Sequence, residues 1–456
     1  MTERASYTSV IANRGFLNLW INQILVQLSY NSLNFALIIW VFQLTNSTTA
    51  VAALMFAVYL PSVFFGLFSG VLVDLMDRKK IIMVINICLA FLFFSLIFLK
   101  FYYPAIVVVA FLVNTLGQFY LPTEASAIPL MVKRRELITA NSIFSATLYS
   151  CFLLGFGLAG PAISHLGINF VFGFGTTILI LGFILAFAFP TIFAKPDQQG
   201  KKLLHALRYK KYSEIKEIGL EEILQTLRLI RGKLPVLTSI TILAGVQVVI
   251  GVLAVLLPAF LERALQVQAT DASYILVIPL GLGIVLGGLI LGKIGSIIIR
   301  RRVVSYGILF GGLLFLFMAI APIIFPAISY FQIHGPLPFF YQPPLSLLLI
   351  ISSFFLGIAM VSILVPSQTV LQENTPDEDR GKVFATLGVA MSALSLIPVL
   401  LAGILADLYG VIPILMGVGI TITLTGIFGL KPSLFFSKRT LPYNVREFLG
   451  LEHWER

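Results

Sequence analysis

The chain contains twelve apolar runs of about 20 residues or more, separated by polar segments. Runs of this length match helices that cross the hydrocarbon core of a bilayer. The chain is 58% hydrophobic and only 11% charged over 456 residues, which leaves too little polar surface to cover a soluble core. The pattern predicts an all-α membrane protein with spans at 16–42, 49–73, 81–100, 105–131, 140–163, 169–193, 236–261, 272–298, 303–325, 346–371, 382–406 and 411–430.

Basic residues are distributed unevenly across this predicted topology. Of the 31 Lys and Arg residues, all but Lys100 and Arg263 fall on one side of the membrane. Loops rich in Lys and Arg remain in the cytoplasm, so both termini are expected there. The net charge of +11 reflects this bias, and we expect no nucleic-acid partner.

An internal repeat divides the spans into two sets of six. Pro122-Thr123-Glu124-Ala125 in the fourth span aligns with Pro366-Ser367-Gln368-Thr369 in the tenth. Repeated bundles around a midplane site are typical of secondary transporters. The predicted domains are an N-terminal bundle, a cytoplasmic linker with an amphipathic helix, a C-terminal bundle and a cytoplasmic tail, at 1–193, 194–235, 236–430 and 431–456.

A charged segment joins the second and third spans. It carries Gly70, Asp74, Arg78 and Lys79. The glycine permits close helix approach, the acid suits a helix N-terminus, and Arg78 could pair with an acid on a neighbouring loop. Such contacts can hold a gate closed and break when it opens. The alternative is an ordinary charged turn that obeys the cytoplasmic bias of basic residues.

This segment resembles the loop signature of the major facilitator superfamily, Gly-x-x-x-Asp-Arg-x-Gly-Arg-[Lys/Arg]. Leu75 and Asp77 depart from it. Residues 122–161 and 366–384, the latter including Arg380, are similar to segments of bacterial efflux-type members related to macrolide and siderophore exporters.

The resemblance implies two six-helix bundles that alternate access to a small-molecule cargo. It also implies that Asp74 and Arg78 stabilise the outward-facing state, with Arg380 in the matching loop of the second half. We expect a monomer in the bacterial cytoplasmic (inner) membrane, with lipid around it and protons as a possible second partner.

Glycines and a proline recur in the fifth span. Gly155, Gly157, Gly160 and Pro161 partly resemble the glycine-proline signature of proton-coupled drug exporters. Glycines bring helices close together, and a proline inside a helix removes one backbone donor. Helix packing is the favoured interpretation of this cluster.

Glu124 is the acid of the chain placed well inside a predicted span; the other acids lie at span ends, in loops or near the interface. Ionisable groups deep in a bilayer are costly and usually functional. Glu124 could exchange a proton as a midplane cavity opens to either face, attract a cationic group on the cargo, or serve as a structural carboxyl bonded to polar neighbours.

Amides form a stripe on the first span. Gln23, Gln27, Asn31 and Asn34 are spaced by four, four and three residues, which places them on one helical face. They are predicted to line a cargo cavity or to hydrogen-bond to another helix. Weaker candidates for the cavity lie on the fourth, seventh and tenth spans: Asn114, Gln118, Gln247 and Gln368.

The residues predict no enzyme, cofactor or metal site. The four histidines form no cluster, no Ser-His-Asp or Cys-His set is visible, and no Gly-x-x-x-x-Gly-Lys-[Ser/Thr] phosphate loop occurs. The favoured hypothesis is a proton-coupled exporter of an amphipathic small molecule, such as a drug, siderophore or lipid-like compound. Two alternatives stay open: an uncoupled or importing carrier, supported by Asn31 where related exporters have an acid, and a non-transporting membrane scaffold.

Overall fold

The computed structural model describes residues 7–74, 76–133, 136–190, 233–294, 300–324, 344–375 and 380–430. In these ranges the regular secondary structure is helical, and twelve helices are long and apolar enough to cross a membrane. Each of the twelve overlaps one of the apolar runs identified in the sequence. The all-α fold with twelve spans is therefore confirmed.

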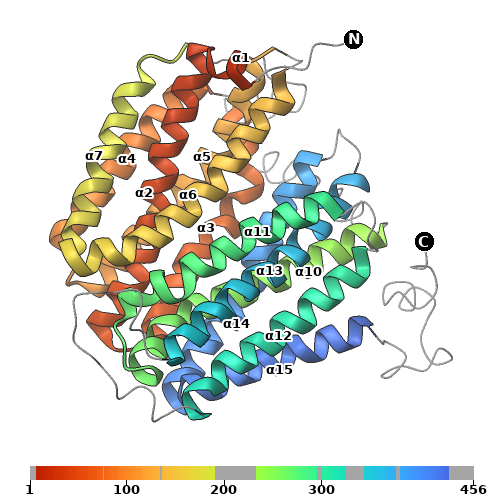
Figure 1. Cartoon of the computed structure of the whole chain (residues 1–456). Coiled ribbons are helices and arrows are strands. Elements are labelled where there is room, and N and C mark those ends of the chain that lie inside the picture. Colours follow the sequence, from red (N-terminus) through yellow and green to blue (C-terminus); the bar gives the residue numbers. More distant parts are fainter. Residues whose placement is uncertain are drawn as a thin grey trace, which may run out of the picture. The chain divides into compact units, whose positions relative to one another are not determined.

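The chain divides into two compact units (Figure 1). Unit 1 comprises Met1–Leu44 and Phe56–Leu227, and unit 2 comprises Thr45–Met55 and Arg228–Arg456. The expected amphipathic linker and the expected tail fall almost entirely on residues 191–232 and 431–456, outside the described part of the chain.

Unit 1 consists of a short first helix followed by six long ones. Its helices are α1 (Tyr7–Ile11), α2 (Arg14–Thr45), α3 (Thr48–Asp74), α4 (Arg78–Leu99), α5 (Tyr103–Met131), α6 (Leu137–Leu166) and α7 (Ile168–Ala186), although α3 begins in unit 2. Helices α4 and α7 pack side by side along their length (Figure 1). Gly175 permits this approach, because a Cβ at this position would lie 2.5 Å from ring carbons of Phe93. Because glycine has no side chain, the two helices can come into close contact at this position.

Unit 2 contains the remaining spans. They are α10 (Leu234–Ala259) with η2 (Phe260–Ala264), η3 (Ala269–Asp271) and η4 (Ser273–Val277) with α11 (Ile278–Ile294), α12 (Arg300–Ile324), α13 (Pro344–Glu373), α14 (Arg380–Tyr409) and α15 (Val411–Leu430). Buried residues of α10, α13 and α14 form one apolar core, including Val236, Leu371 and Val383. Helices α11 and α13 cross at Gly283 and Gly357, where an added Cβ on either glycine would overlap a carbonyl oxygen of the other helix.

Both units turn sharply before their last span. Gly167 joins α6 to α7 with a φ of 81°, and Gly410 joins α14 to α15 with a φ of 89°. Glycine adopts this left-handed conformation without a steric penalty. The same one-residue connection at the same place in each set of six spans agrees with the repeat seen in the sequence.

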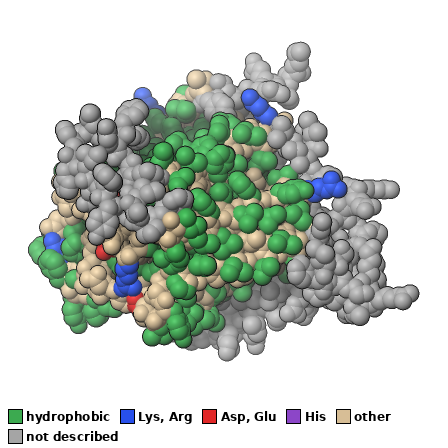
Figure 2. All heavy atoms as spheres, turned by 60° about the horizontal axis from the view of Figure 1, so that its bottom comes forward, with side chains coloured by type: hydrophobic (Ala, Val, Ile, Leu, Met, Phe, Trp, Pro, Cys, Tyr) green, Lys and Arg blue, Asp and Glu red, His purple; other side chains and the backbone are tan. Residues whose placement is uncertain are grey.

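The surface is largely apolar. Figure 2 shows a face covered mainly by hydrophobic side chains, with a few Lys and Arg residues around its margin. On α4, Phe91, Phe94 and Phe98 are 68%, 49% and 71% exposed. Large apolar groups at such exposure are costly in water and are suited to contact with lipid chains.

Candidate functional site

Glu124 lies in the interior of unit 1. It projects from α5 and is only 3% exposed. Its Oε1 atom lies 3.0 Å from the hydroxyl of Tyr120, one helical turn earlier on the same helix. Among the described residues, no Lys or Arg forms an ion pair with this carboxyl. Glu124 therefore contacts a neutral partner in a site closed to water and lipid.

Tyr120 links this carboxyl to two other helices. Its hydroxyl lies 3.1 Å from Oδ1 of Asn22 on α2, and Nδ2 of Asn22 donates to the backbone oxygen of Gly182 on α7 at 2.8 Å. The side chains of Tyr120 and Asn22 are fully buried. A continuous hydrogen-bonded chain thus runs from α5 through α2 to α7.

Asn86 of α4 lies beside this chain. The point that a Cβ on Gly182 would occupy is 3.1 Å from Nδ2 of Asn22 and also 3.1 Å from Nδ2 of Asn86. Asn86 is fully buried, and neither of its side-chain polar atoms has a hydrogen-bond partner within the described part of the chain. A buried amide in this condition is costly, so its position next to Asn22 calls for an explanation.

The amide stripe on α2 is directed largely at neighbouring helices. Gln23 donates to the backbone oxygen of Phe144 on α6 at 3.1 Å, and Asn31 donates to Gln27 O of its own helix at 2.8 Å. Asn31 also packs against Gly155, where an added Cβ would lie 2.7 Å from its Cβ. Gln23, Gln27 and Asn31 are buried. Gln23 thus bonds to another helix, whereas Asn31 bonds within α2 and packs against α6; whether the stripe also lines a cargo cavity stays a prediction.

Asn34 continues the stripe toward α5. Nδ2 of Asn114 lies 3.2 Å from Oδ1 of Asn34, and the hydroxyl of Tyr30 donates to Oδ1 of Asn114. This second polar bridge also joins α2 to α5, although it does not include the carboxyl of Glu124. The other cavity candidates, Gln118 on α5, Gln247 on α10 and Gln368 on α13, are half-buried.

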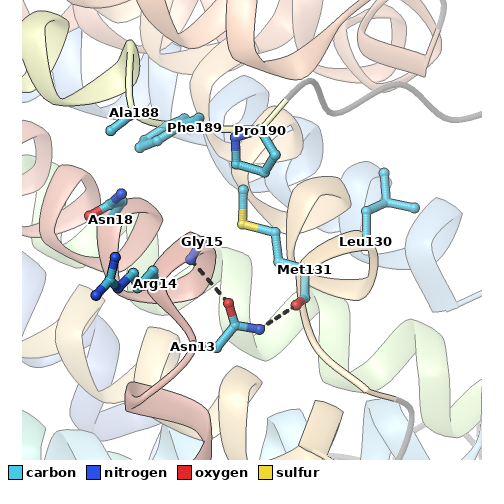
Figure 3. Close-up of a pocket in the computed structure, with 9 residues that line it drawn as sticks. All are labelled: Asn13, Arg14, Gly15, Asn18, Leu130, Met131, Ala188, Phe189 and Pro190. Carbon is cyan, nitrogen blue, oxygen red and sulfur yellow. Dashed lines mark hydrogen bonds between the residues drawn. The ribbon is translucent and has the colours of Figure 1, made fainter.

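A cavity of about 440 Å³ lies at the predicted cytoplasmic end of unit 1 (Figure 3). It is bounded by the start of α2, the end of α5 and the segment after α7. The side chain of Asn13 bridges two of these elements, because it donates to Met131 O at 2.7 Å and accepts from Gly15 N at 3.0 Å. None of the predicted cargo-cavity residues lines this cavity.

The basic residues of the charged segment make contacts within unit 1. Arg78 is buried at the start of α4, with Nε 3.4 Å from the hydroxyl of Ser126 on α5. Lys79 Nζ donates to the backbone oxygens of Phe187 and Phe189, at 2.8 and 2.7 Å. A cation at the end of a helix is stabilised by its free carbonyls, so Lys79 is a C-terminal cap of α7.

The other members of the segment contribute less to the described contacts. A Cβ on Gly70 would meet no described atom within 4 Å, so the expected close helix approach at this glycine stays a prediction. The side chains of Asp74 and Arg380 lie outside the described part of the chain. Gly157, Gly160 and Pro161 lie within α6, and Gly155 of the same helix packs against Asn31 and Ser32 of α2.

Sequence reasoning missed a polar junction inside unit 2. The carboxylate of Asp407, near the end of α14, accepts from the hydroxyl of Ser47 at 2.7 Å and from the backbone N–H groups of Thr48 and Thr49 at 3.0 and 2.9 Å. Arg263 forms an ion pair with it at 3.3 Å. The only signal in the sequence was Arg263 itself, one of two basic residues on the side otherwise lacking them.

This junction explains why Thr45–Met55 belongs to unit 2. The hydroxyl of Thr48 donates to Gly403 O at 2.7 Å, and a Cβ on Gly403 would lie 2.7 Å from Thr48 O. Helices α3 and α14 are thus in backbone contact at this point. The predicted N-terminal domain, 1–193, contains all of this helix, whereas the first residues of α3 are held by α14.

The described residues contain no group of three or more His, Cys, Asp or Glu side chains that could hold a metal ion. Cys88 and Cys151 are free thiols, and Cys151 is buried on α6. The polar groups assembled here are therefore a carboxyl, a phenol and several amides, which are suited to moving or holding a proton and to hydrogen-bonding.

Comparisons with known proteins agree with this architecture. An uncharacterized MFS-type transporter of Bacillus subtilis (strain 168), YfiS, is 24% identical over 391 residues, covering 85% of this chain and 86% of the relative. An auto-inhibited peptide transporter of the POT family superposes with a TM-score of 0.68 at 14% identity, covering 94% of this chain and 99% of its own. The nucleoside transporter NupG superposes with a TM-score of 0.60 at 13% identity, covering 92% of this chain and 99% of NupG.

At these identities the solved structures establish the fold alone. The sequence profile of the Major Facilitator Superfamily matches residues 19–339 and 250–448, which together overlap all twelve spans. The chain therefore belongs to the Major Facilitator Superfamily and is a multi-pass membrane transporter of that type.

Proposed function

We propose that this transporter exports an amphipathic small molecule across the bacterial cytoplasmic membrane and is driven by the proton gradient. Both termini lie in the cytoplasm, in keeping with the distribution of Lys and Arg. The efflux direction and the amphipathic cargo rest on the similarity of residues 122–161 and 366–384 to exporters. The cargo site alternates between the two membrane faces.

One observation supports the proton as the coupling ion: a carboxyl that is 3% exposed, lies within the span Tyr103–Met131, and has a tyrosine hydroxyl as its hydrogen-bond partner. A buried carboxylate without a counter-ion is strongly disfavoured, whereas a protonated carboxyl can be accommodated. The proposal requires that Glu124 meets water in another state of the cycle. Pro122, two residues earlier, removes one backbone hydrogen bond of α5 and gives the helix a place to deform.

Transport in liposomes tests the proposal. The purified protein is reconstituted with a pH-sensitive dye trapped inside, and a panel of fluorescent amphipathic dyes, macrolides, peptides and nucleosides is supplied as cargo, with and without an imposed pH gradient. We expect an amphipathic compound to move against its gradient together with a counterflow of protons. Cargo transport at the same rate with and without the pH gradient would refute proton coupling. Transport restricted to peptides or nucleosides would refute the proposal that the cargo is an amphipathic small molecule.

Glu124→Gln identifies the coupling group. This change keeps the side-chain volume and removes the titratable proton, so gradient-driven accumulation should be lost while downhill exchange of the same compound continues. Glu262→Gln is the matched control, because Glu262 is a half-buried acid in η2 whose closest described bond is to the backbone of Ala269. An uncoupled carrier would behave alike in the parent and both variants.

A further inference from the structure

The chain between Glu124 and Gly182 has more acceptors than hydrogens unless Glu124 carries a proton. A carbonyl oxygen only accepts, so the amide group facing Gly182 O must be the NH2 of Asn22. The group of Asn22 that faces Tyr120 is then its oxygen, another acceptor. The single hydroxyl hydrogen of Tyr120 can occupy only one of its two contacts, at 3.1 Å to Asn22 and 3.0 Å to Glu124.

A protonated Glu124 satisfies both contacts. Its O–H then donates to the oxygen of Tyr120, Tyr120 donates to Asn22, and Asn22 donates to Gly182. If the proton leaves, the hydroxyl of Tyr120 turns to the carboxylate, because a charged acceptor makes the stronger bond. Oδ1 of Asn22 then loses its donor in a fully buried position.

We infer that Tyr120 and Asn22 are positioning residues that read the protonation state of Glu124 and transmit it to the packing of α2 against α4 and α7. The inference rests on the proposed proton coupling and names the residues that connect it to helix movement. Asn86 completes the arrangement. Its Nδ2 and that of Asn22 both lie 3.1 Å from the point that a Cβ on Gly182 would occupy, and Asn86 has no bond among the described residues. We therefore assign to Asn86 the donation to Oδ1 of Asn22 that Tyr120 gives up.

Among the groups that surround it, Glu124 is the one whose charge we expect to change. The other titratable groups that face it are Tyr120 on its own helix and Cys151 on α6, whose Sγ lies 3.9 Å from Ile24 O of α2. Arg78 of α4 contacts Ser126, two positions along α5, rather than the carboxyl. The groups that α7 and α2 contribute to the hydrogen-bonded chain carry no charge: they are the backbone oxygen of Gly182 and the amide of Asn22.

Infrared difference spectroscopy on the protein in lipid tests the inference without a cargo, since the probe is the proton itself, varied as buffer pH below the range in which tyrosines ionise. The parent should show a protonated-carboxyl band that disappears as the pH rises, together with changes in tyrosine and amide side-chain bands. Glu124→Gln should lose all three. Tyr120→Phe should shift the frequency of the carboxyl band and lose the tyrosine change.

Two further variants complete the test. Asn22→Leu should keep the carboxyl and tyrosine changes and lose the amide change, and it carries the test if Tyr120→Phe does not fold. Tyr30→Phe is the matched control: it removes another hydroxyl that bridges α2 and α5, through Asn114, and should leave all three signals unchanged. An unshifted carboxyl band in Tyr120→Phe, or an unchanged amide signal in Asn22→Leu, would overturn the inference.

The two proposals fail in different experiments. If the liposomes show no proton movement with cargo but the spectra behave as described, the proposed function is wrong and the hydrogen-bonded chain still responds to Glu124. If proton-coupled transport is present but cutting the chain at Tyr120 leaves the spectra unchanged, coupling is correct and the residues inferred to transmit it are wrong.

Discussion

Asp407 joins the end of α14 to the start of α3 and supports a quantitative prediction for Asp407→Asn. Its Oδ1 accepts from Thr48 N and Arg263, and its Oδ2 accepts from Ser47 Oγ and Thr49 N. An asparagine has one acceptor oxygen in place of two, so whichever way its amide is turned, one of the two backbone N–H groups, that of Thr48 or that of Thr49, loses its acceptor. The remaining N–H group no longer bonds to a charge.

The magnitude follows from which contact dominates. Hydrogen bonds to a charged group contribute about 1.5–3 kcal/mol each, and loss of a helix N-cap costs about 0.5–2 kcal/mol. The ion pair is weaker, because Arg263 is 40% and Asp407 25% exposed, and exposed pairs contribute about 0–1 kcal/mol. We therefore expect Asp407→Asn to destabilise unit 2 by about 2–3 kcal/mol. Arg263→Gln, which loses the exposed ion pair and a donation to Asn46 O, should cost about 1 kcal/mol.

Thermal unfolding in mild detergent, followed by the loss of helical circular dichroism, ranks these variants. Ser47→Ala completes a double-mutant cycle with Asp407→Asn and should show a coupling energy of about 0.5–3 kcal/mol, as expected of groups in contact. Salt separates the two contributions. Screening should remove the ion-pair part of the effect of Arg263→Gln, leave the part due to its lost donation to Asn46 O, and leave most of the effect of Asp407→Asn.

The reasoning is refuted if Arg263→Gln costs as much as Asp407→Asn, or if high salt makes Asp407→Asn indistinguishable from the parent. Either result would mean that the ion pair, and not the capping of α3, holds this junction. Additive costs for Ser47 and Asp407 would likewise show that their 2.7 Å contact carries no energy of its own.

Two further predictions concern helix contacts. Gly283→Ala should destabilise the protein by about 1–3 kcal/mol, because its Cβ would overlap the carbonyl oxygen of Phe354, whereas Gly292→Ala on the same helix meets nothing within 4 Å and should stay within about 0.5 kcal/mol of the parent in thermal unfolding. Lys79→Met should cost about 1–2 kcal/mol through the lost cap of α7; transport lost without any change in thermal stability would instead assign Lys79 to gating.

The spans were predictable because a bilayer tolerates few alternatives. A backbone that cannot bond to water must bond within its own helix, so a sufficiently long apolar run determines both the type and the length of the element. The run predicted at 16–42 is the helix Arg14–Thr45, and the run at 411–430 is Val411–Leu430. Differences occur at the ends, where polar residues such as Asn13 and Asp77 extend or cap the helix.

The amide stripe shows what a single sequence leaves open. The spacing of Gln23, Gln27 and Asn31 predicts a shared helical face, but not which neighbour this face meets. The neighbour is α6, more than 100 residues away along the chain, and Gly155 admits Asn31 because it lacks a side chain. Spacing within one helix contains no information about such a partner.

The carboxyl at position 124 was identified by elimination, whereas its partners were not. Asn22 falls outside the predicted stripe, and Tyr120 is one of 15 tyrosines. They matter because Tyr120 lies one turn before Glu124, and because the packing of α2 on α5 places Asn22 next to Tyr120, from which it is 98 residues away in the sequence. The first relation was visible as an i, i+4 spacing; the second requires the packing of two helices.

Stability alone does not account for Glu124. Lys79 and Asp407 satisfy carbonyl and N–H groups that every helix leaves free at its ends, so their polar atoms serve the fold directly. Glu124 lies within α5, away from the free N–H and carbonyl groups at either end of the helix. Buried polar groups are often replaceable by apolar ones of similar size at no loss of stability, and a leucine at this position would leave Tyr120 free to donate to Asn22 without competition. A residue that costs energy to bury, and that leaves its neighbours with one hydrogen too few when it ionises, is the residue expected of the proposed proton coupling.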